Sequence, residues 1–205
     1  YLYYAFGQNL FKRKLPFCKT IDKTKAAVLI NMIERGINAP LTSGCGRLFD
    51  AVSALVGVRG QIDYEAQAAV ELEMAAYDSQ ENGAYPFTVD IERGVRVIRL
   101  GELFSAILSD LSDGVPISAI SSRFHNTVAQ IISEVCSQIA KETDIKWVAL
   151  SGGVFQNRLL LRKTFAALKR TGFTVLTHGQ VPCNDGGVSL GQAVIANSLF
   201  GAAIH

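Results

Sequence analysis

Hydrophobic residues recur at helical spacing through the first third of the chain, after a start with no regular period. Residues 1–22 are therefore expected to be irregular, and an amphipathic helix is predicted from Lys23 to about Gly36. Its apolar positions are Ala26, Leu29, Ile30, Ile33 and Ile37. A second helix is predicted through residues 52–56 and a third over about residues 65–77. Three consecutive helices with short connections predict an all-helical layer.

The hydrophobic period then changes to two. Apolar and polar residues alternate on both sides of a turn at residues 92–94, which predicts a β-hairpin. Helices are predicted over about residues 101–111 and 118–141, and the second carries a long apolar stripe that is typical of a buried face. We therefore expect a mainly helical segment over residues 1–83 and an α/β segment over residues 84–205.

The last third of the chain alternates strands and helices. Residues 147–150 and 173–177 are predicted strands, and helices are predicted over about residues 156–171 and 188–200. A strand, a helix and a second strand with short links predict a parallel βαβ unit. We expect these strands and helix 118–141 to form the core of a sheet that is covered by helices on both faces.

Composition places the chain among globular proteins and limits its partners. Its hydrophobic fraction is 49% and its charged fraction 19%, which excludes general disorder. Twenty Lys and Arg against eighteen Asp and Glu leave a net charge of +2, too small a bias to indicate nucleic-acid binding. The four cysteines form no metal or disulfide pattern, and no apolar run approaches the length that spans a bilayer. We expect a cytoplasmic protein with reduced thiols and no secretion signal, whose partners include neither membrane nor nucleic acid.

Two adjacent glycines, Gly152 and Gly153, lie where an apolar strand ends and a helix is predicted to start. Free backbone N–H groups and the helix dipole favour an anion at such a position, and glycines let a phosphate approach the backbone. Asn157 in the same segment could exchange hydrogen bonds with a ribose or a base. A tight turn that needs glycines only for packing explains the pattern equally well. The segment matches neither the P-loop nor the dinucleotide-binding motif.

A second glycine-terminated loop, residues 182–187, precedes the last predicted helix and contains Asp185. An aspartate at such a position most often caps the helix. The alternative is a carboxylate ligand for a metal or a metal–phosphate complex, because open α/β folds bind ligands at the carboxyl ends of their strands. A third candidate segment, residues 44–50, places Asp50 in the first turn of its predicted helix. The three histidines have no metal-ligand spacing.

Four segments occur in an order that resembles the [NiFe]-hydrogenase maturation carbamoyltransferases of the HypF family: residues 42–51, 64–73, 150–157 and 182–192. The resemblance covers about residues 23–200. It implies an α/β fold, namely a ribonuclease H-like lobe of the actin-like ATPase (ASKHA) class with an added helical layer. The helical and α/β segments would together make one partial carbamoyltransferase domain.

The resemblance also implies a reaction for the intact protein. Carbamoyl phosphate is hydrolysed, carbamoyl-adenylate is formed from ATP, and the carbamoyl group passes to the C-terminal cysteine of a HypE-like partner in hydrogenase maturation. ATP and a divalent metal (zinc, iron or magnesium) are the implied cofactors, with Asp185 as a metal ligand. No catalytic residue is implied. The implied nucleotide-binding residues are Gly152 and Gly153 at the phosphates, Asn157 and Asp50 at the nucleoside, and Glu71 or Gln67 at the ribose.

The sequence also departs from the family pattern. Ala66 stands where a glycine is expected, and nothing matches the family's histidine-rich metal motif or its acylphosphatase-like, zinc-finger and YrdC-like parts. We therefore expect an excised fragment or a shortened homologue that is inactive by itself. The alternatives are a transferase of the tRNA threonylcarbamoyladenosine type, or a non-catalytic remnant that acts as a partner-binding module. An ATP titration separates them, because a scaffold would bind no nucleotide.

Overall fold

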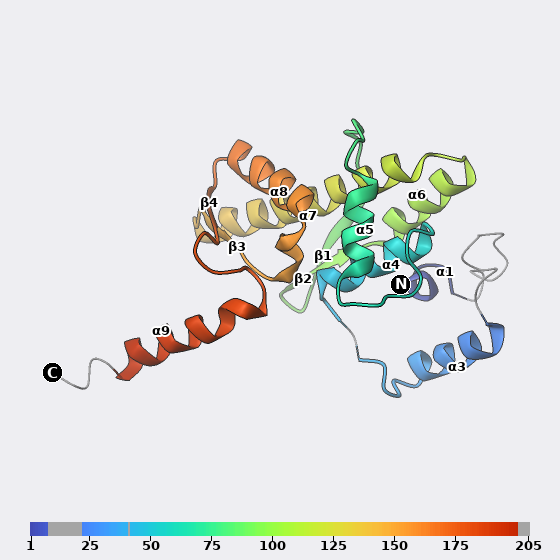
Figure 1. The fold of residues 1–205 in the computed structure, drawn as a ribbon, viewed down its shortest axis with the longest axis horizontal. Coiled ribbons are helices and arrows are strands. Elements are labelled where there is room, and N and C mark those ends of the chain that lie inside the picture. The colour runs from blue at the N-terminus through green and yellow to red at the C-terminus, as the bar shows by residue number, and fades with distance from the viewer. Residues whose placement is uncertain (8–21, 41, 201–205) are drawn as a thin grey trace. The chain divides into compact units, whose positions relative to one another are not determined.

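The computed structural model describes residues 1–7, 22–40 and 42–200, and its chain divides into two compact units, Tyr1–Ile131 and Ile132–His205 (Figure 1). Each unit is described by itself. The compact units divide within the helix Ile117–Thr143. A domain boundary at residue 83 stays a prediction.

Helices make up most of the first unit. Their bounds are α1 Leu2–Phe6, α3 Lys23–Glu34, α4 Cys45–Leu55, α5 Gln67–Ala75, α6 Gly101–Ser112 and the first half of α7 Ile117–Thr143. The helices predicted from hydrophobic spacing are confirmed. The expectation of an irregular start is wrong for α1, because five residues are too few to show a period. Tertiary contact stabilises this helix: the ring of Tyr1 stacks on Phe104 of α6 at 5.6 Å between centroids.

The core of the first unit is aromatic at its centre. Phe49 of α4 meets Phe124 and His125 of α7 edge-on, with ring centroids 4.8 and 5.2 Å apart. All three side chains are fully buried. His125 therefore belongs to the buried face that the apolar stripe of α7 predicts. Other fully buried residues around it are Val52, Leu72, Leu103, Ile107, Leu108 and Ile120.

The predicted hairpin is confirmed. Strands β1 (Thr88–Glu92) and β2 (Val95–Arg99) pair antiparallel, with Glu92 opposite Val95. Arg93 and Gly94, the two residues between them, both have positive φ, at 51° and 78°. Positive φ at both central residues is the conformation of a type I′ turn, whose twist matches that of the strands it joins.

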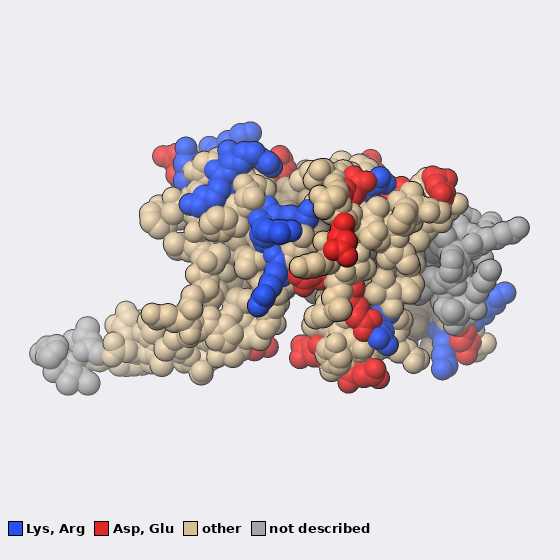
Figure 2. All heavy atoms as spheres, turned by 45° about the horizontal axis from the view of Figure 1, so that its top comes forward, with Lys and Arg blue, Asp and Glu red and all other residues tan. Residues whose placement is uncertain are grey.

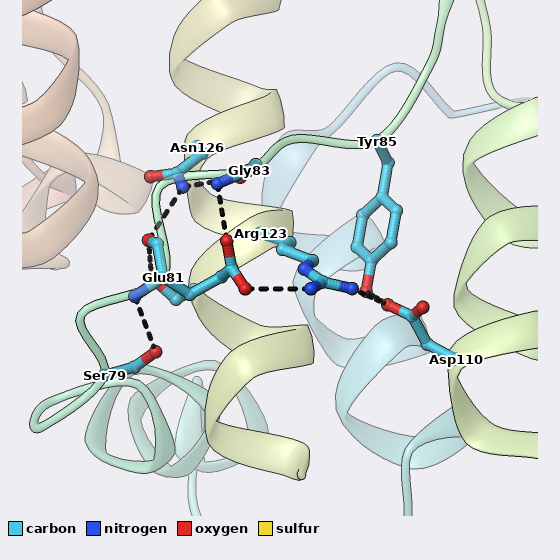
Figure 3. Close-up of polar contacts among 8 residues, drawn as sticks. Ser79, Glu81, Gly83, Tyr85, Asp110, Arg123 and Asn126 are labelled. Carbon is cyan, nitrogen blue, oxygen red and sulfur yellow. Dashed lines mark hydrogen bonds and ion pairs between the residues drawn. The ribbon is translucent and has the colours of Figure 1, made fainter. Parts of the chain in front are cut away.

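A polar cluster fixes the segment before the hairpin onto α6 and α7 (Figure 3). Arg123 of α7 lies between two carboxylates and donates to Glu81 and to Asp110 of α6, each at 2.8 Å. The hydroxyl of Tyr85 donates to the same oxygen of Asp110 at 2.7 Å. The backbone of Gly83 donates to Glu81 at 2.7 Å and accepts from α7 through Asn126. These contacts tie together residues from three parts of the first unit.

The second unit is a parallel βαβ arrangement, as predicted. Strands β3 (Trp147–Leu150) and β4 (Thr174–Thr177) pair in parallel, and α8 (Arg158–Arg170) connects them. Leu150, Leu168, Phe173 and Val175 form its buried cluster, against which the second half of α7 packs through Ile132, Cys136 and Ala140. Helix α9 (Val188–Phe200) follows, and none of its described residues is buried.

The expectation of helices on both faces of this sheet is wrong for the described part of the second unit. Val148, Leu150 and Val175 face the helices, whereas Trp147 and Leu176 on the opposite face are 65% and 48% exposed. Alternate residues of a strand point to opposite faces, so one layer of helices covers only one set. No helix among the described residues is long and apolar enough to cross a membrane.

Candidate functional site

Two loops that are distant in sequence meet at the carboxyl ends of β3 and β4. The backbone N–H of Gly152, just after β3, donates to the carbonyl of Cys183 at 2.7 Å. A Cβ built on Gly153 would lie 3.9 Å from the Cβ of Asn184, next to Asp185. The structure therefore brings Gly152, Gly153 and the Asp185 loop together at the edge of the sheet where ligands bind in α/β folds.

The glycine turn has the features that its sequence predicts. Gly152 has φ 103° and ψ 154°, a conformation that is essentially restricted to glycine. A 3₁₀ turn over Gly153–Gln156 then precedes α8. In the described part of the chain, the backbone N–H groups of Gly153 and Val154 have no hydrogen-bond acceptor. These two donors follow two adjacent glycines that carry no Cβ, so the oxygens of an anion can approach them.

Asn157 holds the start of α8. It is the N-cap residue, and its side-chain oxygen accepts from the backbone N–H of Leu160 at 2.8 Å. Its side chain is almost completely buried. The structure thus gives Asn157 a structural role in placing the glycine turn against the helix, and its contact to a nucleoside stays a prediction.

The second loop is a tight turn with an exposed carboxylate. Asn184, not Asp185, caps the short helical turn, because its side chain accepts from Gly186 N at 3.1 Å. The helix-cap interpretation of Asp185 is therefore wrong by one residue. Its side chain is exposed and makes no hydrogen bond or ion pair with any described residue. At Gly187 a Cβ would lie 2.8 Å from the carbonyl of Pro182, so only glycine fits there.

Sequence reasoning missed two side chains at this site. The ring Nε2 of His178 lies 2.9 Å from the hydroxyl of Ser151. Each is the first residue after its strand, and the register places Leu150 opposite Thr177 just before them. The sequence signal that could have drawn attention to them is that each directly follows a predicted strand of the βαβ unit. His178 and Cys183 also line a cavity of about 160 Å³, whose other walls are Leu150, Phe155, Leu161, Thr177, Val181 and Pro182.

Basic side chains lie along the helix that follows the glycine turn. Figure 2 shows Lys and Arg gathered over α8, which begins directly after Asn157. The helix has no acidic residue; its basic residues are Arg158, Arg162, Lys163, Lys169 and Arg170. Burial and the neighbouring Arg162 lower the pKa of Lys163. A surface of one sign of charge next to the turn favours an anionic ligand.

The residues present do not complete a metal site. Among the described residues, no group of three His, Cys, Asp or Glu side chains lies close enough to hold a metal ion. A protein site for a divalent metal typically supplies three or four ligands. Asp185 is exposed and could act as one ligand, but nothing described here supplies the others, so we derive no step through a metal.

The remaining predicted residues lie in the first unit. Glu71 of α5 receives two hydrogen bonds from Arg59, at 2.5 and 2.8 Å, and one from Gln67 at 3.0 Å. The hydrogen bonds from Arg59 hold the pKa of Glu71 below its ordinary value. A carboxylate has about four acceptor positions, so one stays available for a hydroxyl group. Gln67 is buried and also accepts from Asp63 N, which makes Glu71 the better placed of the two to touch a ribose.

Two more residues that the sequence singles out, Ala66 and Asp50, also lie in the first unit. Ala66, the N-cap of α5, has φ 64° and ψ 5°, a left-handed conformation that glycine adopts without strain. This explains why a glycine is expected at that position. Asp50 lies in the second turn of α4, because the helix begins at Cys45 and not near Asp50 as predicted. Its carboxylate lies 3.5 Å from the guanidinium of Arg47.

Comparison with known proteins identifies similar chains. The family profile described as "Carbamoyltransferase, Kae1-like Domain, second subdomain" matches residues 1–192. The chain is 36% identical over 159 residues to the carbamoyltransferase HypF of Synechocystis sp., covering 78% of this chain and 20% of that protein. It also matches the crystal structure of full-length HypF in the phosphate- and nucleotide-bound form. That match has a TM-score of 0.87 and 41% identity, and covers 97% of this chain and 26% of the other.

A more distant similarity bears on the alternative function. The tRNA N6-adenosine threonylcarbamoyltransferase of Bacillus subtilis is 27% identical over 176 residues, covering 80% of this chain and 49% of that protein. The higher identities of the first two matches favour the hydrogenase-maturation resemblance over the tRNA-modifying one. Together with the structural match, they confirm the expected α/β fold class.

Proposed function

Since this chain belongs to the carbamoyltransferase HypF family, we propose that it is the nucleotide-binding part of a longer ATP-dependent carbamoyltransferase. The chain spans between a fifth and about a quarter of the length of the relatives named above that carry the HypF name. The whole enzyme would use carbamoyl phosphate and ATP and carbamoylate the C-terminal cysteine of a HypE-like partner in the cytoplasm. The fragment alone would bind nucleotide without completing the reaction.

The joined glycine turn is the observation that carries this proposal. The hydrogen bond from Gly152 to Cys183 joins the turn to the Asp185 loop, and the N–H groups of Gly153 and Val154 have no acceptor among the described residues, which leaves them available to phosphate oxygens. The basic surface of α8 adds a favourable potential (Figure 2). Nucleotide bound to the full-length relative supports the same kind of ligand for this chain. The family resemblance is the support for assigning nucleoside contacts to Asn157 in the second unit and to Asp50 and Glu71 or Gln67 in the first, and each of these assignments stays a prediction for its residue.

Titration of the chain with ATP tests the proposal. We expect weak binding, because an intact site buries about 70–90% of a ligand and this chain supplies only part of one. Gly153→Val should abolish binding, since its branched side chain would cover the two free N–H groups. Gly191→Val in α9 is the matched control, because a Cβ at Gly191 meets nothing within 4 Å and one at Gly153 meets only the Cβ of Asn184 at 3.9 Å. If Gly153→Val titrates like the parent, the phosphate-loop assignment is wrong.

The non-catalytic alternative makes the opposite prediction. A partner-binding module that has lost its nucleotide site would show no heat or spectral change with ATP, for the parent as for the variant. The alternative of a tRNA-modifying transferase predicts binding of tRNA as well as ATP. The net charge of +2 offers little electrostatic attraction for tRNA, so we expect none at physiological salt.

A further inference from the structure

Ser151 and His178 form a hydrogen-bonded pair whose position follows from the sheet register. In the parallel sheet Leu150 lies opposite Thr177, so Ser151 and His178, the residues that directly follow them, lie side by side. The two side chains meet at 2.9 Å, between the ring Nε2 and the hydroxyl oxygen. Both residues are exposed, and Ser151 directly precedes Gly152. The pair therefore lies at the entrance of the glycine turn and not in the core.

The geometry does not favour a nucleophilic serine. In catalytic triads, a third group orients the histidine through its other ring nitrogen. In the part of the chain that the structure describes, Ser151 is the side chain hydrogen-bonded to His178, and no carboxylate joins it. A histidine that contacts only the serine can instead fix the direction of the hydroxyl group.

The direction of the hydrogen bond decides what the hydroxyl can bind. When His178 Nε2–H donates to Ser151 Oγ, the serine proton points away from the ring and is available as a donor. A donor at this place adds to the N–H groups of Gly153 and Val154, which also lack an acceptor among the described residues. Hydrogen bonds to a charged acceptor are stronger than those to a neutral one.

We propose that Ser151 is a further phosphate contact of the nucleotide and that His178 is its positioning residue, acting through the 2.9 Å hydrogen bond. This inference rests on the proposed function, because it needs a nucleotide phosphate at the glycine turn. His178 also lines the cavity beside the turn, together with Cys183.

The test compares ligands with and without phosphates. The chain is titrated with ATP and with adenosine by NMR, which follows millimolar affinities. Ser151→Ala should raise the dissociation constant of ATP about 10-fold, the effect of one hydrogen bond to a charged group, and leave that of adenosine unchanged. His178→Leu should act in the same direction, and should add nothing to Ser151→Ala in the double variant. Ser189→Ala in α9 is the matched control.

Conservative variants separate positioning from folding. Ser151→Thr keeps the hydroxyl and His178→Gln keeps a side-chain donor, so both should restore most of the ATP affinity. Melting temperatures of all variants should equal that of the parent, since both side chains are exposed. Additive losses in the double variant, or equal losses for adenosine, would overturn the inference.

The outcomes also separate this inference from the proposed function. If Gly153→Val abolishes ATP binding while Ser151→Ala binds like the parent, only the inference is overturned. If the parent binds no ATP, or Gly153→Val has no effect, the nucleotide assignment fails and the inference fails with it.

Discussion

The backbone N–H of Gly152 donates a 2.7 Å hydrogen bond to the carbonyl of Cys183. This bond connects the end of β3 to the loop after β4, so the two glycine-bearing segments lie next to each other. Because Gly152 uses its N–H for this contact, the next two residues supply the donors for a ligand. The division of roles between Gly152 and Gly153 can be tested separately.

Gly152→Ala should destabilise the second unit, whereas Gly153→Ala should not. Residues forced into conformations such as that of Gly152 cost about 1–3 kcal/mol. A Cβ on Gly153 meets nothing closer than the Cβ of Asn184 at 3.9 Å, which is ordinary contact. Thermal unfolding of both variants beside the parent measures the difference. Equal melting temperatures for the two variants would contradict the structural role of Gly152.

Ala66→Gly should stabilise the chain. A left-handed conformation costs a non-glycine residue about 1–2 kcal/mol, and part of this is offset because glycine loses more entropy on folding. We expect a net gain of about 0.5–1 kcal/mol in the free energy of unfolding, measured by urea denaturation. Ala68→Gly, inside α5, is the control and should lower stability by about 1 kcal/mol. A loss of stability in Ala66→Gly would show that its backbone carries no strain.

Glu81→Gln should weaken the dependence of stability on acid pH. The backbone N–H of Gly83 and then Arg123 hold the pKa of Glu81 below its ordinary value of 4.5. A carboxylate whose pKa is lower in the folded state stabilises the fold above its unfolded pKa. That contribution disappears as the pH falls through the folded pKa.

The melting temperature of Glu81→Gln should therefore lie below that of the parent at neutral pH, with the gap closing in acid. Glu65→Gln, at an exposed residue before α5, is the control for the loss of one surface carboxylate. A gap that stays constant down to low pH would contradict the role of the ionised Glu81 carboxylate in the cluster of Figure 3.

Leu168→Ala should be far more damaging than Leu199→Ala. Leu168 of α8 is 0% exposed within the cluster of the second unit, whereas Leu199 of α9 is 68% exposed. Truncating a buried leucine costs about 2–5 kcal/mol, since it removes contacts and leaves a cavity. The exposed leucine should change stability by no more than about 0.5 kcal/mol. Urea unfolding of the two variants gives both values.

Asp185→Ala should leave the metal content of the purified chain unchanged and low. Asp185 offers one carboxylate, and the described residues supply no group of three ligands around it. Elemental analysis before and after dialysis against a chelator measures the content directly. Stoichiometric metal that is lost in Asp185→Ala would show that this chain does hold a complete ligand set. Metal that stays bound in the variant would show that Asp185 is not a metal ligand.

The sequence alone determined the elements that depend on local chemistry. The spacing of apolar residues predicts α3 and α7, and the alternation around Arg93 and Gly94 predicts the hairpin, because side-chain periodicity is a property of the element itself. Gly152 likewise shows in the sequence, since its backbone conformation admits essentially only glycine. The ordered segments also indicated the family before any contact was known.

Only the tertiary structure decided which residues meet. The pairing of Ser151 with His178 depends on strand register, and the capping role of Asn184 in place of Asp185 depends on one hydrogen bond to Gly186. Helix α1 was missed because its stability comes from the contact of Tyr1 with Phe104 and not from its own five residues. Such contacts join residues far apart in the chain, and their energies are set by packing that no local pattern encodes.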